Sequence, residues 1–316
     1  MARIVLALLL LASTARAASQ VAPGVTLVPG AFVPGTQPDG NSVVLDGPKG
    51  LVVVDTGRHP EHTRAILDVA RAAKKPIVAV VNTHWHLDHV GGNPTVRHDF
   101  PEVRVYASDA IVAARKGFLA DYQKQLEQLV AAEPDAEKTK PFRAELAILA
   151  AGDKLGPDEK IAASGPRTLA GRKLDVHLEK YAVTAGDVWL LDPETGTLIA
   201  GDLVTLPVPF MDTACPARWL EALDRLAKLD FKVLIPGHGA PMTRSDFTTY
   251  RTAFAALVKC GGSSADKATC VDGWVKDAGP LLGSADPKFT KVLADYYVEN
   301  SLRGNAPRNA KLCGKG

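Results

Sequence analysis

Short apolar runs separated by polar turns recur along the chain, and β-branched residues dominate them. Runs of this length between Gly, Pro, Asn and Asp residues are typical of buried strands. The tight turn sequences at 46–50 and 192–196 predict hairpins between neighbouring runs. The predicted strands are 25–28, 42–45, 51–54, 77–81, 103–106, 168–178 (a strand or a hairpin), 188–191, 198–200 and 233–235.

Between these strands, apolar residues return at helical spacing and predict helices at 60–73, 93–98, 108–114, 217–229 and 245–258. Residues 117–150 are polar, contain few strand formers and predict one or two helices with a break near Glu133-Pro134. We therefore expect a helical insertion at 107–160, which is either a solvated cap or a lid over a site. We expect a main domain over 19–257 and a helical C-terminal extension over 258–316.

The predicted strand 77–81 leads into a stretch that is rich in metal-ligand side chains: His84, His86, Asp88 and His89. Residues two apart in extended chain point the same way, so His84 and His86 can face one point. Asp88 and His89 can reach a second point nearby. Imidazole and carboxylate groups suit zinc, and less often iron or manganese. A set of exposed histidines on a polar loop is the alternative, but so dense a cluster favours a metal site.

Two later segments share this design, with an apolar strand that ends in a ligand residue beside glycine: Gly201-Asp202 and Gly237-His238-Gly239. Glycine lets the backbone turn sharply beside a metal. The predicted metal ligands are therefore His84, His86, Asp88, His89, Asp202 and His238.

These motifs, in this order, resemble the metallo-β-lactamase superfamily over residues 22–257. The segments that carry the resemblance are Val54-Asp55-Thr56-Gly57, Thr83-His84-Trp85-His86-Leu87-Asp88-His89-Val90-Gly91-Gly92-Asn93, Ala200-Gly201-Asp202 and Pro236-Gly237-His238-Gly239. The resemblance implies an α+β fold, a four-layer αββα sandwich with its metal site on loops at one edge. It also implies that His84 and His86 belong to a first metal site, that Asp88, His89 and His238 belong to a second, and that Asp202 bridges the two.

The sequence departs from the family pattern at Val183, which stands where the family usually has a histidine that completes the first site. Valine has no donor atom. His177 lies about 20 Å away along an extended strand, so it is a poor substitute. We expect one firmly bound zinc ion at the second site, and a second zinc ion that is weakly bound or absent.

Zinc lowers the pKa of bound water to about 7 and so supplies hydroxide at neutral pH. Asp202 and Asp88 are the candidate catalytic residues, and Asp202 is the better placed to orient water and carry a proton. Asp55 either orients a ligand histidine or only forms a turn. Trp85 and Asn93 either line the pocket or, as we favour, pack structurally. The histidines predicted to be solvated are His59, His62 and His98.

An apolar run at 4–12 follows Arg3 and precedes small residues near Ala17. This pattern predicts a signal peptide over 1–18 and a periplasmic or secreted protein. A membrane anchor is the alternative, but the run is too short to span a bilayer, so we expect no stable membrane insertion.

The chain has four cysteines, which allow three pairings and fit an oxidising compartment. The Gly-Gly-Ser-Ser loop between Cys260 and Cys270 favours that pair, which leaves Cys215 with Cys313. A zinc–thiolate site is disfavoured because there is no Cys-x-x-Cys.

The chain has 316 residues, 46% of them hydrophobic, which is ample for a sizeable core. Its formal charge of +2 includes Arg3 and Arg16, so removal of the signal peptide leaves about zero. A near-neutral protein lacks the basic field that holds a polyanion, which disfavours a nuclease and any nucleic-acid partner.

We therefore predict an exported zinc hydrolase that cleaves an amide, lactam, ester or thioester bond in a small molecule. The alternative is a catalytically degenerate binding protein of the same fold that keeps one metal site. Specificity is expected to reside in the loops at 30–40, 107–160 and 203–216.

Overall fold

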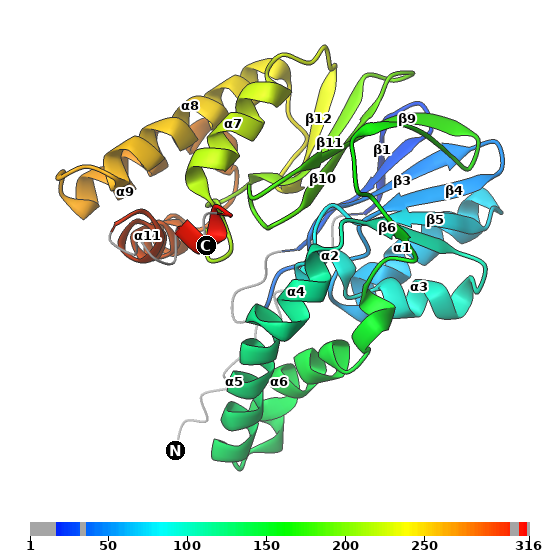
Figure 1. The fold of residues 1–316 in the computed structure, drawn as a ribbon, viewed down its shortest axis with the longest axis horizontal. Helices are drawn as coiled ribbons and strands as arrows, with labels where there is room; N and C mark the ends of the chain where they lie inside the picture. The colour runs from blue at the N-terminus through cyan, green and yellow to red at the C-terminus, as the bar shows by residue number, and fades with distance from the viewer. Residues whose placement is uncertain (1–16, 32–35, 304–309, 315–316) are drawn as a thin grey trace, which may run out of the picture.

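Two β-sheets packed face to face, with helices outside each of them, make up the fold (Figure 1). The structure is a computed structural model that describes residues 17–31, 36–303 and 310–314. The predicted signal peptide, residues 1–18, lies almost wholly outside the described residues. The predicted four-layer αββα arrangement is confirmed.

The first sheet has seven strands in the order β1-β2-β3-β4-β5-β6-β7. Strands β1 to β4 pair antiparallel, and β4 to β7 pair parallel. The predicted hairpin at 46–50 joins β3 to β4. The strands are β1 (Ser19–Ala22), β2 (Val25–Val28), β3 (Ser42–Gly47), β4 (Gly50–Val54), β5 (Ile77–Val81), β6 (Arg104–Ala107) and β7 (Glu159–Lys160).

The second sheet has five strands in the order β12-β11-β10-β9-β8, and β11 and β12 are parallel. The predicted hairpin at 192–196 joins β10 to β11, and the run at 168–178 belongs to the β8–β9 hairpin. The strands are β8 (Gly165–Leu169), β9 (Arg172–Glu179), β10 (Asp187–Asp192), β11 (Thr197–Thr205) and β12 (Val233–His238).

The apolar faces of the two sheets meet in one buried core. Val43, Val52 and Val54 of the first sheet and Val188 and Ile199 of the second are each no more than 3% exposed. Burying such a side chain fully stabilises the fold by roughly 1.5–3 kcal/mol. The core therefore fixes which face of each strand points inward, while the strand ends are free to carry polar side chains.

Helices cover the outer face of each sheet. On the first sheet, Ile66 and Leu67 pack against Val53 and Val80. On the second sheet, Trp219 and Phe254 are fully buried. The covering helices are α1 (Pro60–Ala73), α2 (Leu87–Val90), α3 (Asn93–Asp99), α7 (Pro216–Leu226), α8 (Arg244–Gly261), α9 (Lys267–Asp277), α10 (Gly279–Leu282) and α11 (Pro287–Tyr297), followed by η2 (Val298–Leu302).

The predicted polar helices of the insertion form α5 (Phe118–Ala132) and α6 (Ala136–Leu149), preceded by α4 (Ala110–Lys116) and followed by η1 (Gly152–Leu155). Asp135 ends the break between α5 and α6 by accepting a hydrogen bond from the backbone N–H of Glu137. Figure 1 shows α5 and α6 as a pair that projects away from the sheets.

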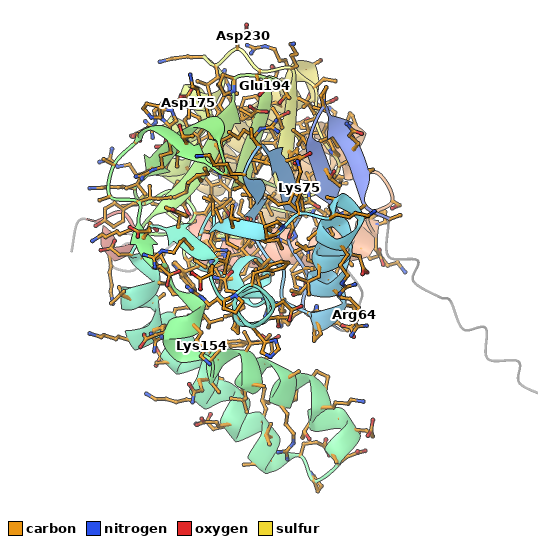
Figure 2. The ribbon with its side chains drawn as sticks, turned by 90° about the vertical axis from the view of Figure 1, so that its right-hand side faces the viewer. Arg64, Lys75, Lys154, Asp175, Glu194 and Asp230 are labelled. Carbon is orange, nitrogen blue, oxygen red and sulfur yellow. A yellow bond between two sulfur atoms is a disulfide. The ribbon has the colours of Figure 1, made fainter. Side chains whose placement is uncertain are left out.

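Charged side chains of both signs lie on the outer surface (Figure 2). The labelled examples are Arg64, Lys75, Lys154, Asp175, Glu194 and Asp230. Within the described part of the chain, no helix has the length and apolar character needed to cross a bilayer.

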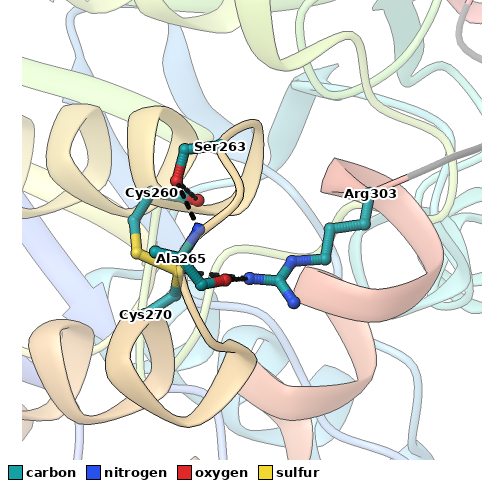
Figure 3. The surroundings of a disulfide bond; sticks show 5 residues. All are labelled: Cys260, Ser263, Ala265, Cys270 and Arg303. Atoms are coloured by element: carbon teal, nitrogen blue, oxygen red, sulfur yellow. Dashed lines mark hydrogen bonds between the residues drawn. A yellow bond between two sulfur atoms is a disulfide. The ribbon is translucent and has the colours of Figure 1, made fainter.

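The favoured cysteine pairing is confirmed: Cys260 is bonded to Cys270, and Cys215 to Cys313. Figure 3 shows the first disulfide between the end of α8 and α9, with Ser263 Oγ donating to the Cys260 carbonyl at 2.7 Å. Arg303 donates to the carbonyl of Ala265 in the same turn. The second disulfide ties the C-terminal segment to the start of α7.

Removing the Cys215–Cys313 disulfide is expected to cost more stability than removing Cys260–Cys270. The two disulfides span sequence separations of 98 and 10 residues, and a longer loop loses more freedom in the unfolded chain when it is closed. We expect a loss of about 3–5 kcal/mol for the paired Cys→Ala variant of the long loop and about 2–3 kcal/mol for that of the short one. Urea unfolding of both variants under oxidising conditions measures this difference. Equal losses, or the reverse order, would contradict it.

Candidate metal centre

All six predicted ligand residues come together: four follow the end of β5, Asp202 lies within β11, and His238 ends β12. They form two groups, and the donor atoms within each group lie within 4.8 Å of one another. The first group is His84, His86 and Asp202, and the second is Asp88, His89 and His238. His238 is 11% exposed in its side chain and the other five residues are buried, so the centre is shielded from bulk water.

Two glycines allow β11 and β12 to bring their ligands this close. Gly201 has φ +53°, and a Cβ there would lie 2.6 Å from Thr83. A Cβ at Gly237 would lie 1.9 Å from Oδ1 of Asp202. A larger residue at either position would push these segments apart. This explains the glycines beside both ligands in the sequence.

Asp55 orients two of the histidines. Its Oδ2 accepts a hydrogen bond from Nδ1 of His89 at 2.7 Å and another from the Thr83 hydroxyl at 2.7 Å. Because the Thr83 hydroxyl donates to Asp55, it accepts from Nδ1 of His84, 3.0 Å away. With Nδ1 engaged in these hydrogen bonds, each imidazole directs its Nε2 toward the centre, where a metal ion would bind it. Asp55 was expected either to orient a ligand histidine or only to form a turn. The structure shows the orienting contact, and the φ of +60° at Asp55 shows that the backbone also turns there.

Thr213 orients the third histidine. Its hydroxyl donates to the carbonyl of Val183 at 2.9 Å, so it accepts from Nε2 of His86, also at 2.9 Å. His86 thus presents an unprotonated Nδ1, which lies 2.9 Å from Nε2 of His84. Two such lone pairs cannot hydrogen-bond each other, but both can bind one cation. Thr213 belongs to a loop without a readable motif, so no local pattern of residues indicated this contact.

Two buried atoms at the middle of the centre have no hydrogen-bond partner: Nε2 of His89 and Oδ1 of Asp202. They lie 3.2 Å apart. A buried polar atom left unpaired costs about 1–3 kcal/mol, and few such atoms occur in native proteins. A cation between them would satisfy both. The nitrogen and oxygen donors of the centre therefore fit a divalent metal ion such as zinc.

The first group is electrically suited to bind a metal. Burial lowers the pKa of His84 well below its usual range and lowers the pKa of His86 to about 4. Both imidazoles are therefore neutral near pH 7, which is the form that ligates metals.

The second group carries charge. Burial disfavours the ionised forms of Asp88 and Asp202, but nearby cations together outweigh it, with His89 and His238 foremost, and leave the pKa of each carboxyl lowered. Burial likewise lowers the pKa of His89 and His238, but Asp202 foremost among nearby carboxylates raises it overall. The metal-free centre thus pairs two carboxylates with two cationic imidazoles, and a bound metal would replace those protons.

Val183 contributes no donor to the first group. Its side chain is fully buried in the apolar cluster that also contains Trp189. The carboxylate of Asp187 holds its backbone in place by accepting from the N–H groups of Val183 and Thr184 at 3.0 Å each. His177 stacks on Trp189 with ring centroids 3.9 Å apart and belongs to neither group of ligands.

Arg58 is buried and contacts the centre, and no sequence motif indicated this residue. Its Nη2 lies 3.5 Å from Oδ1 of Asp88, and its Nη1 pairs with Oε2 of Glu145 on α6. The Tyr122 hydroxyl of α5 donates to the same Glu145 oxygen at 3.2 Å. Burial lowers the pKa of Arg58, but Asp88 and Glu145 outweigh it, so the guanidinium stays charged. The helical insertion therefore reaches the predicted ligand Asp88 through two ion pairs that share Arg58.

The prediction that three histidines are solvated is correct only for His98, whose side chain is 87% exposed. His62 is buried, with Nε2 2.8 Å from the Ser42 hydroxyl, and burial lowers its pKa. His59 is partly covered and lies 2.8 Å from Oδ2 of Asp39. Both errors have one cause: the start of α1 packs against polar groups of β3 and the preceding loop.

The ion pair between His59 and Asp39 predicts a pH-dependent stability. The hydrogen bond that His59 donates to Asp39 is the foremost cause that raises the pKa of His59. The stability contributed by this pair is therefore complete below about pH 6.5 and is lost as pH rises through the raised value. Burial raises the pKa of Asp39, but the hydrogen bond with His59, the charge of His62 and two backbone hydrogen bonds together lower it overall, so that contribution is lost only in acid. His59→Asn should therefore destabilise the protein more at about pH 5.5 than at about pH 8.5. Urea unfolding at both pH values tests this, and equal losses would refute it.

Of the two residues for which packing was favoured, Asn93 is fully buried and holds a hydrogen-bond network. It donates to Oδ1 of Asn82 and to the carbonyl of Leu155, each at 2.8 Å, and it accepts from Thr56. Trp85 has both of the roles considered for it. It packs in the interior, where it is 7% exposed, and it also lines the cavity beside the centre.

A cavity of about 460 Å³ opens beside His86, Asp88, Asp202 and His238. Besides Arg58 and the ligand loop at 85–88, its walls come from residues 36–38, α5, residues 205–212 and α11. Residues 36–38, α5 and residues 205–212 fall within the loops expected to carry specificity. The wall from α11 was not expected, because nothing local in the sequence brings a C-terminal helix to this edge.

A family model described as the metallo-beta-lactamase superfamily matches residues 35–238. The chain belongs to the metallo-β-lactamase superfamily. Members of this superfamily typically bind divalent metals, usually zinc, and the two groups of donors here could hold them. The family predicted from the motifs is thus confirmed.

Two relatives and one solved structure illustrate the likeness. The chain is 26% identical over 223 residues to a linear primary-alkylsulfatase of Pseudomonas sp. The matched segment covers 63% of this chain and 41% of that protein. The chain is 43% identical over 47 residues to a hydroxyacylglutathione hydrolase of Nostoc sp., 15% of this chain and 18% of that one. The chain thus spans less than half the length of these curated relatives. A metallo-beta-lactamase from Pontibacter korlensis has a TM-score of 0.56 and 23% identity, covering 75% of this chain and 98% of that one, which shows the shared fold.

Proposed function

We propose that this protein is a zinc-dependent hydrolase that cleaves an amide, lactam, ester or thioester bond in a small molecule. The observation that carries the proposal is the set of inward-facing, partly unpaired donors at the end of a substrate-sized cavity. Relatives named for hydrolysis, including a hydroxyacylglutathione hydrolase and a type 2 metallo-beta-lactamase of Bacillus cereus, support it.

A divalent ion bound here would acidify water and polarise the bond under attack. In this proposal Asp202, whose carboxylate lies at the middle of the centre, would hold the attacking water and accept its proton. Asp88 lies between Arg58 and His238, at 3.5 Å and 3.0 Å, which fixes its carboxylate. Trp85 and Phe210 flank His86 and keep bulk water away from it.

The proposal includes unequal metal sites. Asp88, His89 and His238, together with Asp202, give one zinc ion a full set of ligands. His84 and His86 share only Asp202, because Val183 offers no donor. One zinc ion should therefore be held firmly and a second weakly or not at all.

The proposal also includes export to the periplasm or the outside of the cell. The signal-like sequence at 1–18 and the two disulfides support this location. The partner is a small-molecule substrate, and the mixed surface charges seen in Figure 2 speak against a nucleic acid.

A catalytically degenerate binding protein is the second candidate, and Val183 is the observation that favours it. The two proposals differ in turnover. We would assay the zinc-loaded protein against aryl esters, thioesters and a chromogenic cephalosporin, with and without a chelator. A hydrolase should turn over at least one class, lose that activity on chelation and regain it with zinc. Zinc binding without turnover of any class would favour the binding protein.

A further inference from the structure

The cavity beside the metal centre has mainly apolar walls on two opposite sides. Phe118 and Leu119 of α5 line one side, and Leu293 and Tyr297 of α11 line the other. Figure 1 shows that these helices belong to separate parts of the fold, the insertion and the C-terminal helices. Neither helix supplies a predicted metal ligand, and what the two helices share is that both line the cavity.

Aromatic rings connect the centre to both walls. Trp85 and Phe210 lie against His86 with ring centroids 4.6 and 5.0 Å away. From there Trp85 contacts Phe118 of α5 at 5.6 Å, and Phe210 contacts Tyr297 of α11 at 5.8 Å. An apolar group could therefore touch ring surface from the metal centre to the cavity mouth.

The described residues that line the cavity outside the metal centre offer an anionic group no uncommitted side-chain cation. Among these described residues, Arg58 is the sole lysine or arginine, and it is paired with Asp88 and Glu145. The other charged group outside the metal centre, Asp212, accepts a hydrogen bond from the Tyr296 hydroxyl at 3.1 Å. A carboxylate or sulfonate on the body of a substrate would find no counterion in these walls.

The rim of the cavity is apolar as well. Phe118 is 43% exposed and Phe289 is 36% exposed, and each lies on one of the two wall helices. Exposed apolar groups at the mouth of a cavity are a feature of sites that bind apolar ligands.

From these walls we infer that the non-reacting part of the substrate is a large, uncharged apolar group that lies between α5 and α11. The inference rests on the proposed hydrolase function. Its preferred substrates are neutral esters or thioesters of medium-chain acyl groups, rather than cephalosporins, whose bodies carry a carboxylate. Water adds across the acyl–oxygen or acyl–sulfur bond, and the products are the carboxylic acid and the alcohol or thiol.

A chain-length series tests the inference directly. We would measure kcat/KM of the zinc-loaded protein for p-nitrophenyl acetate, butyrate and octanoate, and for a chromogenic cephalosporin. Each methylene buried in the cavity should favour the longer ester, so we expect a rise of at least about tenfold from acetate to octanoate. The cephalosporin should be slower than the octanoate. A flat or falling series, or a faster cephalosporin, would overturn the inference.

Leu293→Ala identifies the wall that is responsible. We expect it to lower the octanoate-to-acetate ratio of kcat/KM by roughly fivefold, because it shortens an apolar wall. Val292→Ala is the matched control, since Val292 is on the same helix, 65% exposed and outside the cavity lining. It should leave both rates unchanged. A Leu293→Ala protein with an unaltered ratio would contradict the role of α11.

A binding measurement separates failure of this inference from failure of the proposed function. If the zinc-loaded protein turns over none of the esters, thioesters or the cephalosporin, the hydrolase proposal fails, and binding of octanoate and acetate is then followed by tryptophan fluorescence. Tighter binding of octanoate, weakened by Leu293→Ala, would support the apolar site on its own. Equal affinity for the two acids would overturn it.

Discussion

Asp202→Asn is expected to lower kcat/KM about a thousandfold for the best substrate found. Asp202 belongs to the first group of ligands, yet its Oδ1 also lies 3.2 Å from His89 and 3.6 Å from His238 of the second. An amide keeps the shape of the side chain but removes the charge that links the two groups and can accept a proton from water. The same variant should bind less zinc per chain.

The control for this variant is Asp230→Asn, the same change at an exposed carboxylate that is labelled in Figure 2. It should leave both turnover and zinc content as in the unaltered protein. Zinc content is measured by inductively coupled plasma mass spectrometry, and folding of each variant by circular dichroism. An Asp202→Asn protein with turnover within tenfold of the original would contradict the proposed role of Asp202.

Val183→His is expected to raise the zinc content from about one ion per chain toward two, because it would give the first group a third nitrogen ligand. Position 183 adjoins this group through its carbonyl, which binds the Thr213 hydroxyl that holds His86. The valine side chain is fully buried among apolar residues. In the metal-free protein, the new imidazole should therefore cost about 1–3 kcal/mol of stability, and added zinc should recover that loss.

Only an imidazole at position 183 should both bind additional zinc and let the protein recover its stability when zinc is added. Val183→Gln is the matched control, since it places a polar side chain at the same position without an imidazole. It should be destabilised with or without zinc and should gain no metal. Urea unfolding with zinc and with chelator, beside metal analysis of each variant, measures both effects. An unchanged zinc content in Val183→His would show that position 183 does not face the first group.

The local sequence predicted the parts of the fold that local interactions determine. The helix expected at 60–73 is observed as Pro60–Ala73, and the strand at 77–81 as Ile77–Val81. The ligand residues were recognisable for the same reason. Asp202 and His238 each come after an apolar run in the sequence and beside a glycine that a close backbone approach requires, Gly201 and Gly237.

Contacts between distant segments were not predictable from such patterns. Arg58 and Glu145 are 87 positions apart, and His86 and Thr213 are 127 apart. Neither pair has a motif, because an ion pair or hydroxyl contact depends on how whole layers pack. The apolar wall from α11 was not predictable for the same reason. The spacing of its apolar residues is that of any helix packed on a core.

The most direct test of the metal-centre proposal is a zinc titration of the chelated protein with turnover followed at each addition. We predict that the chelated chain stays folded and inactive, and that activity returns in proportion to the first zinc ion bound per chain. A folded, metal-free chain that hydrolyses its substrate at the full rate would contradict the account.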